Sequence, residues 1–66
     1  MSKTAGEKLR ELRGDRSQDK VARDIGISQM ALSYYENGKR VPRDDIKVRL
    51  AKYYKKSVQS IFFNLK

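Results

Sequence analysis

Two helix-capping serines with a glycine between them constrain the fold of this chain more than any other feature. Ser17 can cap one helix, because a serine hydroxyl accepts a free backbone N–H at a helix start. Gly26 can end that helix, since glycine tolerates the left-handed conformation found at helix ends. Ser28 can cap the next helix, over residues 29–36. Helices this short are not stable alone, so they must pack against the rest of the chain.

Three further helices are expected from the flanking sequence. Thr4 and Glu7 have the spacing of a capping box, in which each side chain satisfies a free backbone N–H. Asp44 and Asp45 suit the positive end of a fourth helix, and Ser57 can cap a fifth. Apolar side chains recur at helical spacing at Leu9, Leu12, Val21, Ala22, Ile25, Ala31, Leu32, Tyr35, Ile46, Leu50, Tyr53, Tyr54, Val58, Ile61 and Phe62. The sequence therefore predicts a single all-α domain of five short helices over residues 1–66.

Cysteine and histidine are both absent from the 66 residues. Their absence excludes disulfides, thiolate zinc sites and thiol nucleophiles, and it removes the side chain that titrates near neutral pH. We therefore expect no enzyme, no cofactor and no metal site. The longest apolar runs have three or four residues, far short of the roughly 20 that a membrane span needs. No signal-peptide pattern follows Met1, so a soluble cytoplasmic protein is expected.

Most of the positive charge lies in one segment. The chain has a net charge of +8, and residues 39–56 carry eight basic against two acidic side chains. A basic segment beside a nearly neutral body is typical of a surface that contacts a polyanion such as nucleic acid. The alternative is a solvated helix face that keeps a small protein soluble, and charge alone does not decide between them.

The two central helices form a helix-turn-helix pattern, and the second of them has one polar side. Gln29, Ser33 and Asn37 form a row at i, i+4 and i+8, flanked by Met30 and Tyr34. Glutamine can bond adenine bidentately and a thioether can contact a thymine methyl group, so this side suits the base edges of the major groove. The alternative is that these are ordinary solvated side chains.

Contacts to the DNA backbone are expected beside this polar side. Gln18 lies at the N-terminus of the first of the two helices, where unpaired backbone N–H groups attract an anion. Lys39, Arg40 and Arg43 surround the loop at Gly38 and can reach the same strand. Such contacts fix the position of a protein on DNA without reading its sequence.

A specific set of residues extends over nearly the whole chain. Its members are Ser17, Gln18, Ala22, Gly26, Ile27, Ser28, Gln29, Leu32, Ser33, Glu36, Asn37, Gly38, Lys39, Arg40, Val41, Pro42, Ala51, Tyr54, Ser57, Val58, Ile61 and Phe62. In type and spacing they resemble the helix-turn-helix domain of lambda-repressor and Cro-like regulators, the xenobiotic-response-element family. The resemblance implies a five-helix domain that binds a double-stranded DNA operator, often as a homodimer and often as a repressor, in a prokaryote or a phage.

The resemblance also implies roles for particular residues. The positions that face DNA bases are Gln29, Met30, Ser33 and Tyr34. The positions near the DNA backbone are Gln18, Ser28, Asn37, Lys39, Arg40 and Arg43. Arg13 and Glu36 occupy the positions of a family ion pair that ties the first helix to the end of the third.

The chain departs from the family pattern at three places. Met30 and Tyr34 differ from the polar residues common at base-facing positions, so the operator cannot be copied from any relative. The loop Gly14-Asp15-Arg16 is about two residues shorter than usual and lacks the apolar residue that often precedes the Ser-Gln pair. In and after the fourth helix, Asp44, Lys47 and Lys56 stand where many relatives carry apolar side chains. We expect these changes to leave the basic face of the fourth helix free to meet DNA or solvent.

The C-terminal segment is more apolar than a monomer of this size easily covers. Ile61, Phe62, Phe63 and Leu65 are predicted to contribute to a homodimer interface. A two-fold dimer would place two recognition helices about 34–36 Å apart, opposite the half-sites of a (pseudo)palindromic operator. One alternative from another class is an antitoxin-type module that grips a partner protein through this cluster and regulates its own promoter. A basic membrane-surface or RNA-binding peptide is disfavoured, because no single helix opposes a continuous basic face to a bulky apolar one.

Overall fold

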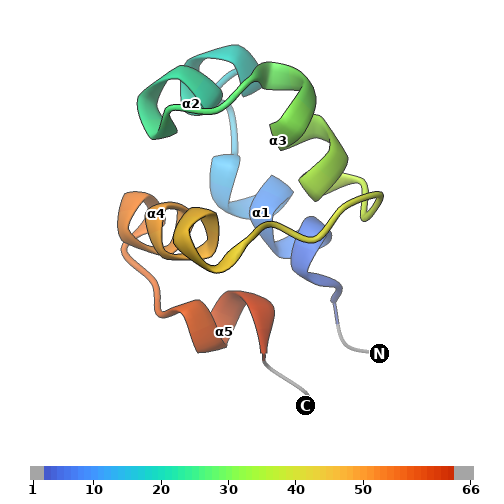
Figure 1. The fold of residues 1–66 in the computed structure, drawn as a ribbon, viewed down its shortest axis with the longest axis vertical. Coiled ribbons are helices and arrows are strands. Elements are labelled where there is room, and N and C mark those ends of the chain that lie inside the picture. The colour runs from blue at the N-terminus through green and yellow to red at the C-terminus, as the bar shows by residue number, and fades with distance from the viewer. Residues whose placement is uncertain (1–2, 64–66) are drawn as a thin grey trace.

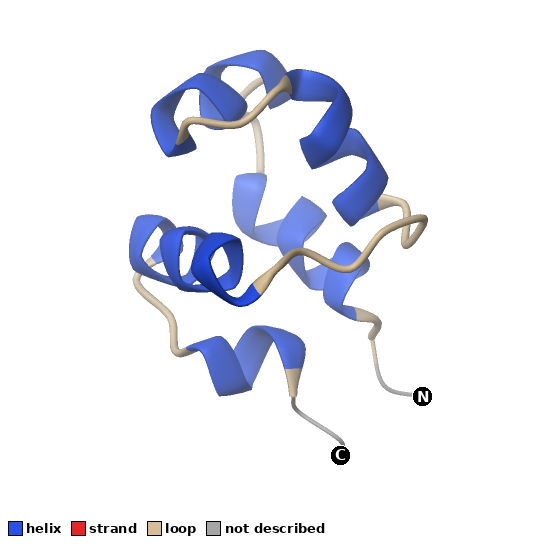
Figure 2. Cartoon of the chain, in the orientation of Figure 1, coloured by secondary structure: helices blue, strands red, loops and turns tan. Residues whose placement is uncertain are grey.

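Side-chain hydroxyls cap the N-termini of four of the helices. The computed structural model describes residues 3–63, which form α1 (Ala5–Arg13), α2 (Gln18–Ile25), α3 (Gln29–Glu36), α4 (Asp44–Tyr54) and α5 (Val58–Phe62). Thr4, Ser17, Ser28 and Ser57 each accept a backbone N–H from the first turn of the helix that follows. α4 begins after Arg43 without such a cap. The expected all-α class and the five helices are confirmed, with no strand over the described residues (Figure 2).

One apolar core draws side chains from all five helices. Figure 1 shows α2 and α3 above α1, α4 to the left of α1 and α5 below it. α1 packs against α3 on one side and against α5 on the other, and α4 packs against both α2 and α5. The buried apolar residues are Leu9, Val21, Ala22, Ile25, Leu32, Ile46, Leu50, Ala51, Tyr54 and Ile61. Each was expected from its helical spacing except Ala51, which shares the inner face of α4 with Leu50.

α1 and α3 approach each other closely at Gly6. A Cβ atom at this position would lie 2.8 Å from the carbonyl oxygen of Tyr35, and closer still to that of Glu36. Real Cβ atoms do not come so close to backbone, so a larger residue would push the helices apart. The contact fixes the last turn of α3 against α1, and it sets where the loop after α3 begins.

Arg16 covers the rings of α4 that the shortened loop would otherwise expose. Its guanidinium carbon lies 5.4 Å from the ring centroids of both Tyr53 and Tyr54, a cation–π geometry. The same guanidinium donates hydrogen bonds to the carbonyl oxygens of Leu12 and Arg13 at the end of α1. Arg16, which stands directly before the Ser-Gln pair, thus lies against the rings of Tyr53 and Tyr54.

Tyr53 and Tyr54 differ in their hydroxyl contacts. Tyr53 donates to Asp24 on α2 at 2.8 Å, and this bond, with a second from Lys20, lowers the pKa of Asp24. The Tyr54 hydroxyl is buried without a hydrogen-bond partner in the described part of the chain. Burial raises the pKa of Tyr54 to about 12, and the nearby Glu36 carboxylate acts in the same direction.

Two helix ends use the left-handed backbone conformation. Gly26 has φ 91° and donates its N–H to the carbonyl oxygen of Ala22, which ends α2 and starts the tight turn into α3. Lys55 has φ 59° and ends α4 in the same way. Glycine adopts this conformation freely, whereas a lysine does so at a cost.

Candidate nucleic-acid interface

The outer side of α3 carries the residues that the sequence assigned to base contacts. Gln29 is exposed, and Met30 is 62% exposed. Ser33 and Tyr34 are half-buried, while Leu32 on the opposite side is fully buried. The polar row is therefore on the surface and the apolar row in the core, as the helical projection of the sequence predicts. That these side chains contact bases stays a prediction.

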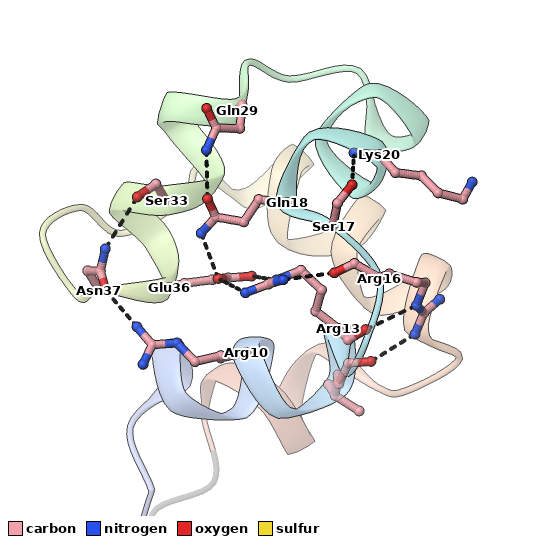
Figure 3. A network of polar contacts seen from close by, with 11 residues as sticks. Arg10, Arg13, Arg16, Ser17, Gln18, Lys20, Gln29, Ser33, Glu36 and Asn37 are labelled. Carbon is pink, nitrogen blue, oxygen red and sulfur yellow. Dashed lines mark hydrogen bonds and ion pairs between the residues drawn. The ribbon is translucent and has the colours of Figure 1, made fainter.

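A hydrogen-bonded network, here the Gln29 network, runs from α1 to Gln29 (Figure 3). Its members are Arg13, Glu36, Gln18 and Gln29. Arg13 donates to both oxygens of Glu36, at 2.8 Å from Nε and 3.1 Å from Nη2. The Gln18 amide nitrogen donates to Glu36 Oε1 at 2.9 Å, and the Gln29 amide nitrogen donates to Gln18 Oε1 at 2.7 Å.

The buried carboxylate of Glu36 sets the direction of the hydrogen bonds in the Gln29 network. The side chain of Glu36 is fully buried and that of Arg13 is 18% exposed, so the ion pair expected from the resemblance is present and largely removed from water. The hydrogen bond that Arg13 donates to Glu36 raises the pKa of Arg13, while burial of the guanidinium acts to lower that pKa. A carboxylate only accepts, so Gln18 must turn its NH₂ group to Glu36 and its oxygen to Gln29. Within residues 3–63 the oxygen and the second N–H of Gln29 have no bond, and an amide oxygen and N–H are the groups that bond adenine.

A second network, here the Ser33 network, consists of Arg10, Asn37 and Ser33. Arg10 on α1 donates from Nη2 to Asn37 Oδ1 at 2.6 Å. Asn37, which follows α3, donates from Nδ2 to the Ser33 hydroxyl oxygen at 3.3 Å. Figure 3 shows Ser33 and Asn37 at the left of α3 and Gln18 at its right, with Gln29 at the start of the helix. Sequence reasoning placed Asn37 near the DNA backbone and missed Arg10, which lies three residues before Arg13 and therefore on the same side of α1.

The predicted contacts to the DNA backbone surround this side of α3. Lys39, Arg40 and Arg43 are all exposed. Arg40 lies over the ring of Tyr34, with 5.6 Å between the guanidinium carbon and the ring centroid. Arg43 is loosely paired with Asp45 at 3.7 Å, a distance that leaves its charge accessible. These cations are free to meet phosphates, which stays a prediction.

Gln18 and Ser28 are both engaged within the protein. One N–H of Gln18 is donated to Glu36, and only the second N–H remains for a phosphate. The Ser28 hydroxyl accepts the backbone N–H of Ala31 as the cap of α3, and its proton remains to be donated. Their predicted role at the DNA backbone is untested.

The structure places only some of the residues predicted for the homodimer interface on the surface. Ile61 is only 2% exposed and belongs to the core, so its assignment to an interface was wrong: on this short helix it points inward. Phe62 packs partly against the same core, whereas Phe63 is 51% exposed. Leu65 lies outside the described residues. Val41, which the sequence analysis did not assign to this surface, is 79% exposed and lines a cavity of about 370 Å³ together with Phe63.

Lys47 lines the same cavity and is mostly removed from solvent. Its side chain is 13% exposed, and its Nζ lies 4.7 Å and 5.7 Å from the ring centroids of Phe63 and Phe62. The expected basic face of α4 therefore excludes Lys47, because the long side chain turns inward over the rings. Over residues 3–63, no helix has the length and apolarity to cross a membrane.

Comparisons with known proteins agree with this geometry. A family profile described as helix-turn-helix matches residues 7–61. The crystal structure of the P22 c2 repressor protein in complex with synthetic operator 9T in the presence of Tl⁺ resembles the fold with a TM-score of 0.89. That alignment has 22% sequence identity and covers 94% of this chain and 97% of the repressor chain. No curated protein sequence matches. The chain belongs to the helix-turn-helix family of lambda-repressor and Cro-like DNA-binding regulators of transcription.

Proposed function

We propose that this protein is a repressor that binds a (pseudo)palindromic operator as a homodimer, with α3 in the major groove. The observation that supports this most strongly is the Gln29 network, which holds the exposed Gln29 through one N–H and leaves its oxygen and second N–H without a bond within residues 3–63. A side chain whose donor and acceptor are both fixed before binding loses little freedom on meeting a base. Repression then follows from occupying a promoter in the cytoplasm of a prokaryotic host.

The surrounding charges support the same orientation on DNA. Lys39 and Arg40 are exposed next to the last turn of α3, and Arg43 precedes α4. Together with the second N–H of Gln18, they place phosphate donors at both ends of the polar row. The resemblance to a repressor solved on an operator agrees with this arrangement.

Selection of bound duplexes from a random pool tests the proposal. The expected consensus is an inverted repeat whose half-sites are about one helical turn apart. The same selection with Gln29→Ala should lose the preference at one base pair of each half-site and keep the rest. Recovery of duplexes without any shared sequence would contradict the proposal, and a consensus without symmetry would contradict the dimeric part of it.

An antitoxin-type function is the second candidate. The exposed Phe63 and Val41 at the rim of the cavity favour it, because they offer an apolar surface that a partner protein could cover. A toxin gene beside the gene for this protein, and co-purification of the toxin, would distinguish this function from repression by a homodimer alone.

A further inference from the structure

The Ser33 network fixes the polarity of a hydroxyl that faces the predicted DNA side. An arginine guanidinium donates and never accepts, so Arg10 can bond only the oxygen of the Asn37 amide. The orientation of an asparagine amide is assigned from its hydrogen-bond partners, and here the partner leaves one choice. The NH₂ group of Asn37 must then point to Ser33, whose oxygen lies 3.3 Å away.

Ser33 is therefore an acceptor on its inner side. A serine hydroxyl has one proton to donate and two lone pairs that accept. Asn37 occupies a lone pair, so the proton is left for another partner. No bond donated by the Ser33 hydroxyl occurs within residues 3–63, including the backbone of the preceding turn of α3 that serine often uses in helices.

We propose that Arg10 is a positioning residue for sequence recognition: through Asn37 it makes Ser33 a hydrogen-bond donor toward DNA. This inference rests on the proposed function, in which α3 lies in the major groove. In that groove guanine and thymine present acceptors, adenine presents an acceptor and a donor, and cytosine presents only its amino donor. The free proton of Ser33 then allows a hydrogen bond to guanine or thymine that a hydroxyl with its proton engaged inside the protein cannot make, although Arg10 itself touches no base.

The Gln29 network and the Ser33 network each begin at an arginine of α1. Arg13 and Arg10 lie three residues apart on this helix, and each contacts the last turn or the end of α3. Hydrogen bonds connect Arg13 through Glu36 and Gln18 to Gln29. Hydrogen bonds also connect Arg10 through Asn37 to Ser33. The helix that stays outside the groove thus sets the donor and acceptor pattern that α3 presents.

Asn37→Asp tests the inference by reversing the polarity of Ser33. The carboxylate still accepts from Arg10 with one oxygen, but its other oxygen can only accept from Ser33. The hydroxyl proton then points inward, and lone pairs alone face the DNA. We expect cytosine and adenine to gain about three- to tenfold in affinity relative to guanine and thymine at the affected base pair.

The measurement uses four duplexes that differ only at the base pair where Ser33→Ala flattens the preference of the wild-type protein. The added negative charge of Asn37→Asp weakens all four duplexes alike, so the ratios among them carry the result. Arg10→Met releases the Asn37 amide and should flatten the ratios. Arg23→Met is the matched control: it removes one charge from an exposed side chain of α2 and should leave the ratios unchanged.

The outcomes separate this inference from the proposed function. Ratios that stay the same in Asn37→Asp, while Ser33→Ala flattens them, overturn the inference and leave DNA recognition by α3 intact. If Ser33→Ala changes the preference at no base pair of the operator, the inference is overturned as well. Equal affinity of the wild-type protein for the selected operator and for scrambled duplexes overturns the proposed function itself.

Discussion

Glu36 connects stability to recognition in a single residue. Its buried carboxylate accepts from Arg13 on α1 and from Gln18 on α2, and so ties both helices to the end of α3. The sequence predicted the pairing with Arg13 through the family resemblance. It did not predict the bond from Gln18, because nothing in sequence spacing shows that two side chains 18 residues apart form a hydrogen bond.

We predict that Arg13→Met lowers the free energy of unfolding by about 3 kcal/mol, since it leaves a buried carboxylate unpaired. Adding Glu36→Leu should restore most of that loss, because the charge left behind is then gone. The restored double variant should still have lost its preference at the Gln29 base pair. Urea denaturation measures the first effect and duplex binding the second; a double variant as unstable as Arg13→Met would refute the buried pair.

Tyr54 predicts a change of stability at alkaline pH. Folding raises its pKa from an ordinary value near 10 to about 12, so the folded state binds the phenolic proton more tightly. This contribution to stability is fully present below pH 10 and is lost as the pH rises through 12. The unfolding free energy of the wild-type protein should therefore fall more steeply across this range than that of Tyr54→Phe.

At neutral pH the same substitution should stabilise the protein by about 1 kcal/mol, because it removes a buried hydroxyl that lacks a partner. Urea denaturation at pH 7 and pH 11 measures both effects. Parallel curves for the two proteins would mean that Tyr54 ionises as freely in the folded state as in the unfolded one.

At the scale of the helix, local signals could be predicted from the sequence and contacts between helices could not. Caps at Thr4, Ser17, Ser28 and Ser57 and the stop at Gly26 act within a few residues, so the boundaries of the helices followed from them. The direction of a side chain on the five-residue α5 depends on how that helix docks. For this reason Ile61, which fits the apolar spacing of the core, was also assigned to the dimer interface, although it lies in the core.

The stacking of Arg16 and the turning of Lys47 into the cavity have the same origin. Each long side chain lies over aromatic rings of another element, but Arg16 stays exposed, whereas Lys47 was expected on the basic face of α4 and is only 13% exposed. The methylene stem and compact charged end of Lys47 allow such burial, which a hydropathy pattern does not show.

The backbone conformation of Lys55 at the end of α4 predicts that a glycine there stabilises the protein. Lys55 holds the left-handed conformation that costs a non-glycine residue roughly 1–2 kcal/mol. Lys55→Gly should raise the free energy of unfolding by about 0.5–1 kcal/mol, after allowing for the greater freedom of glycine in the unfolded chain. The control Lys56→Gly removes the same charge at a residue without positive φ and should not stabilise. Thermal denaturation measures the stability of both variants. An equal gain in stability for both would mean that the lost charge, and not the backbone conformation of Lys55, causes the effect.

For the whole molecule, the exposed apolar side chains predict self-association. Phe63→Ser should weaken a homodimer at least about tenfold, because an aromatic side chain contributes about 1.5–3 kcal/mol when buried. Val48→Ser changes another exposed apolar residue, on α4, and should leave association unchanged. Sedimentation equilibrium with and without DNA measures the association. A monomer under both conditions would exclude the dimer.

The central claim is that the polar side of α3 reads base edges while the surrounding cations hold the DNA backbone. The affinity of Gln29→Ala for the selected operator and for a scrambled duplex tests it most directly, with Arg40→Ala beside it. Gln29→Ala should lose about 1–3 kcal/mol on the operator and almost nothing on the scrambled duplex, whereas Arg40→Ala should weaken both alike. Equal losses on the two duplexes for Gln29→Ala would contradict the claim.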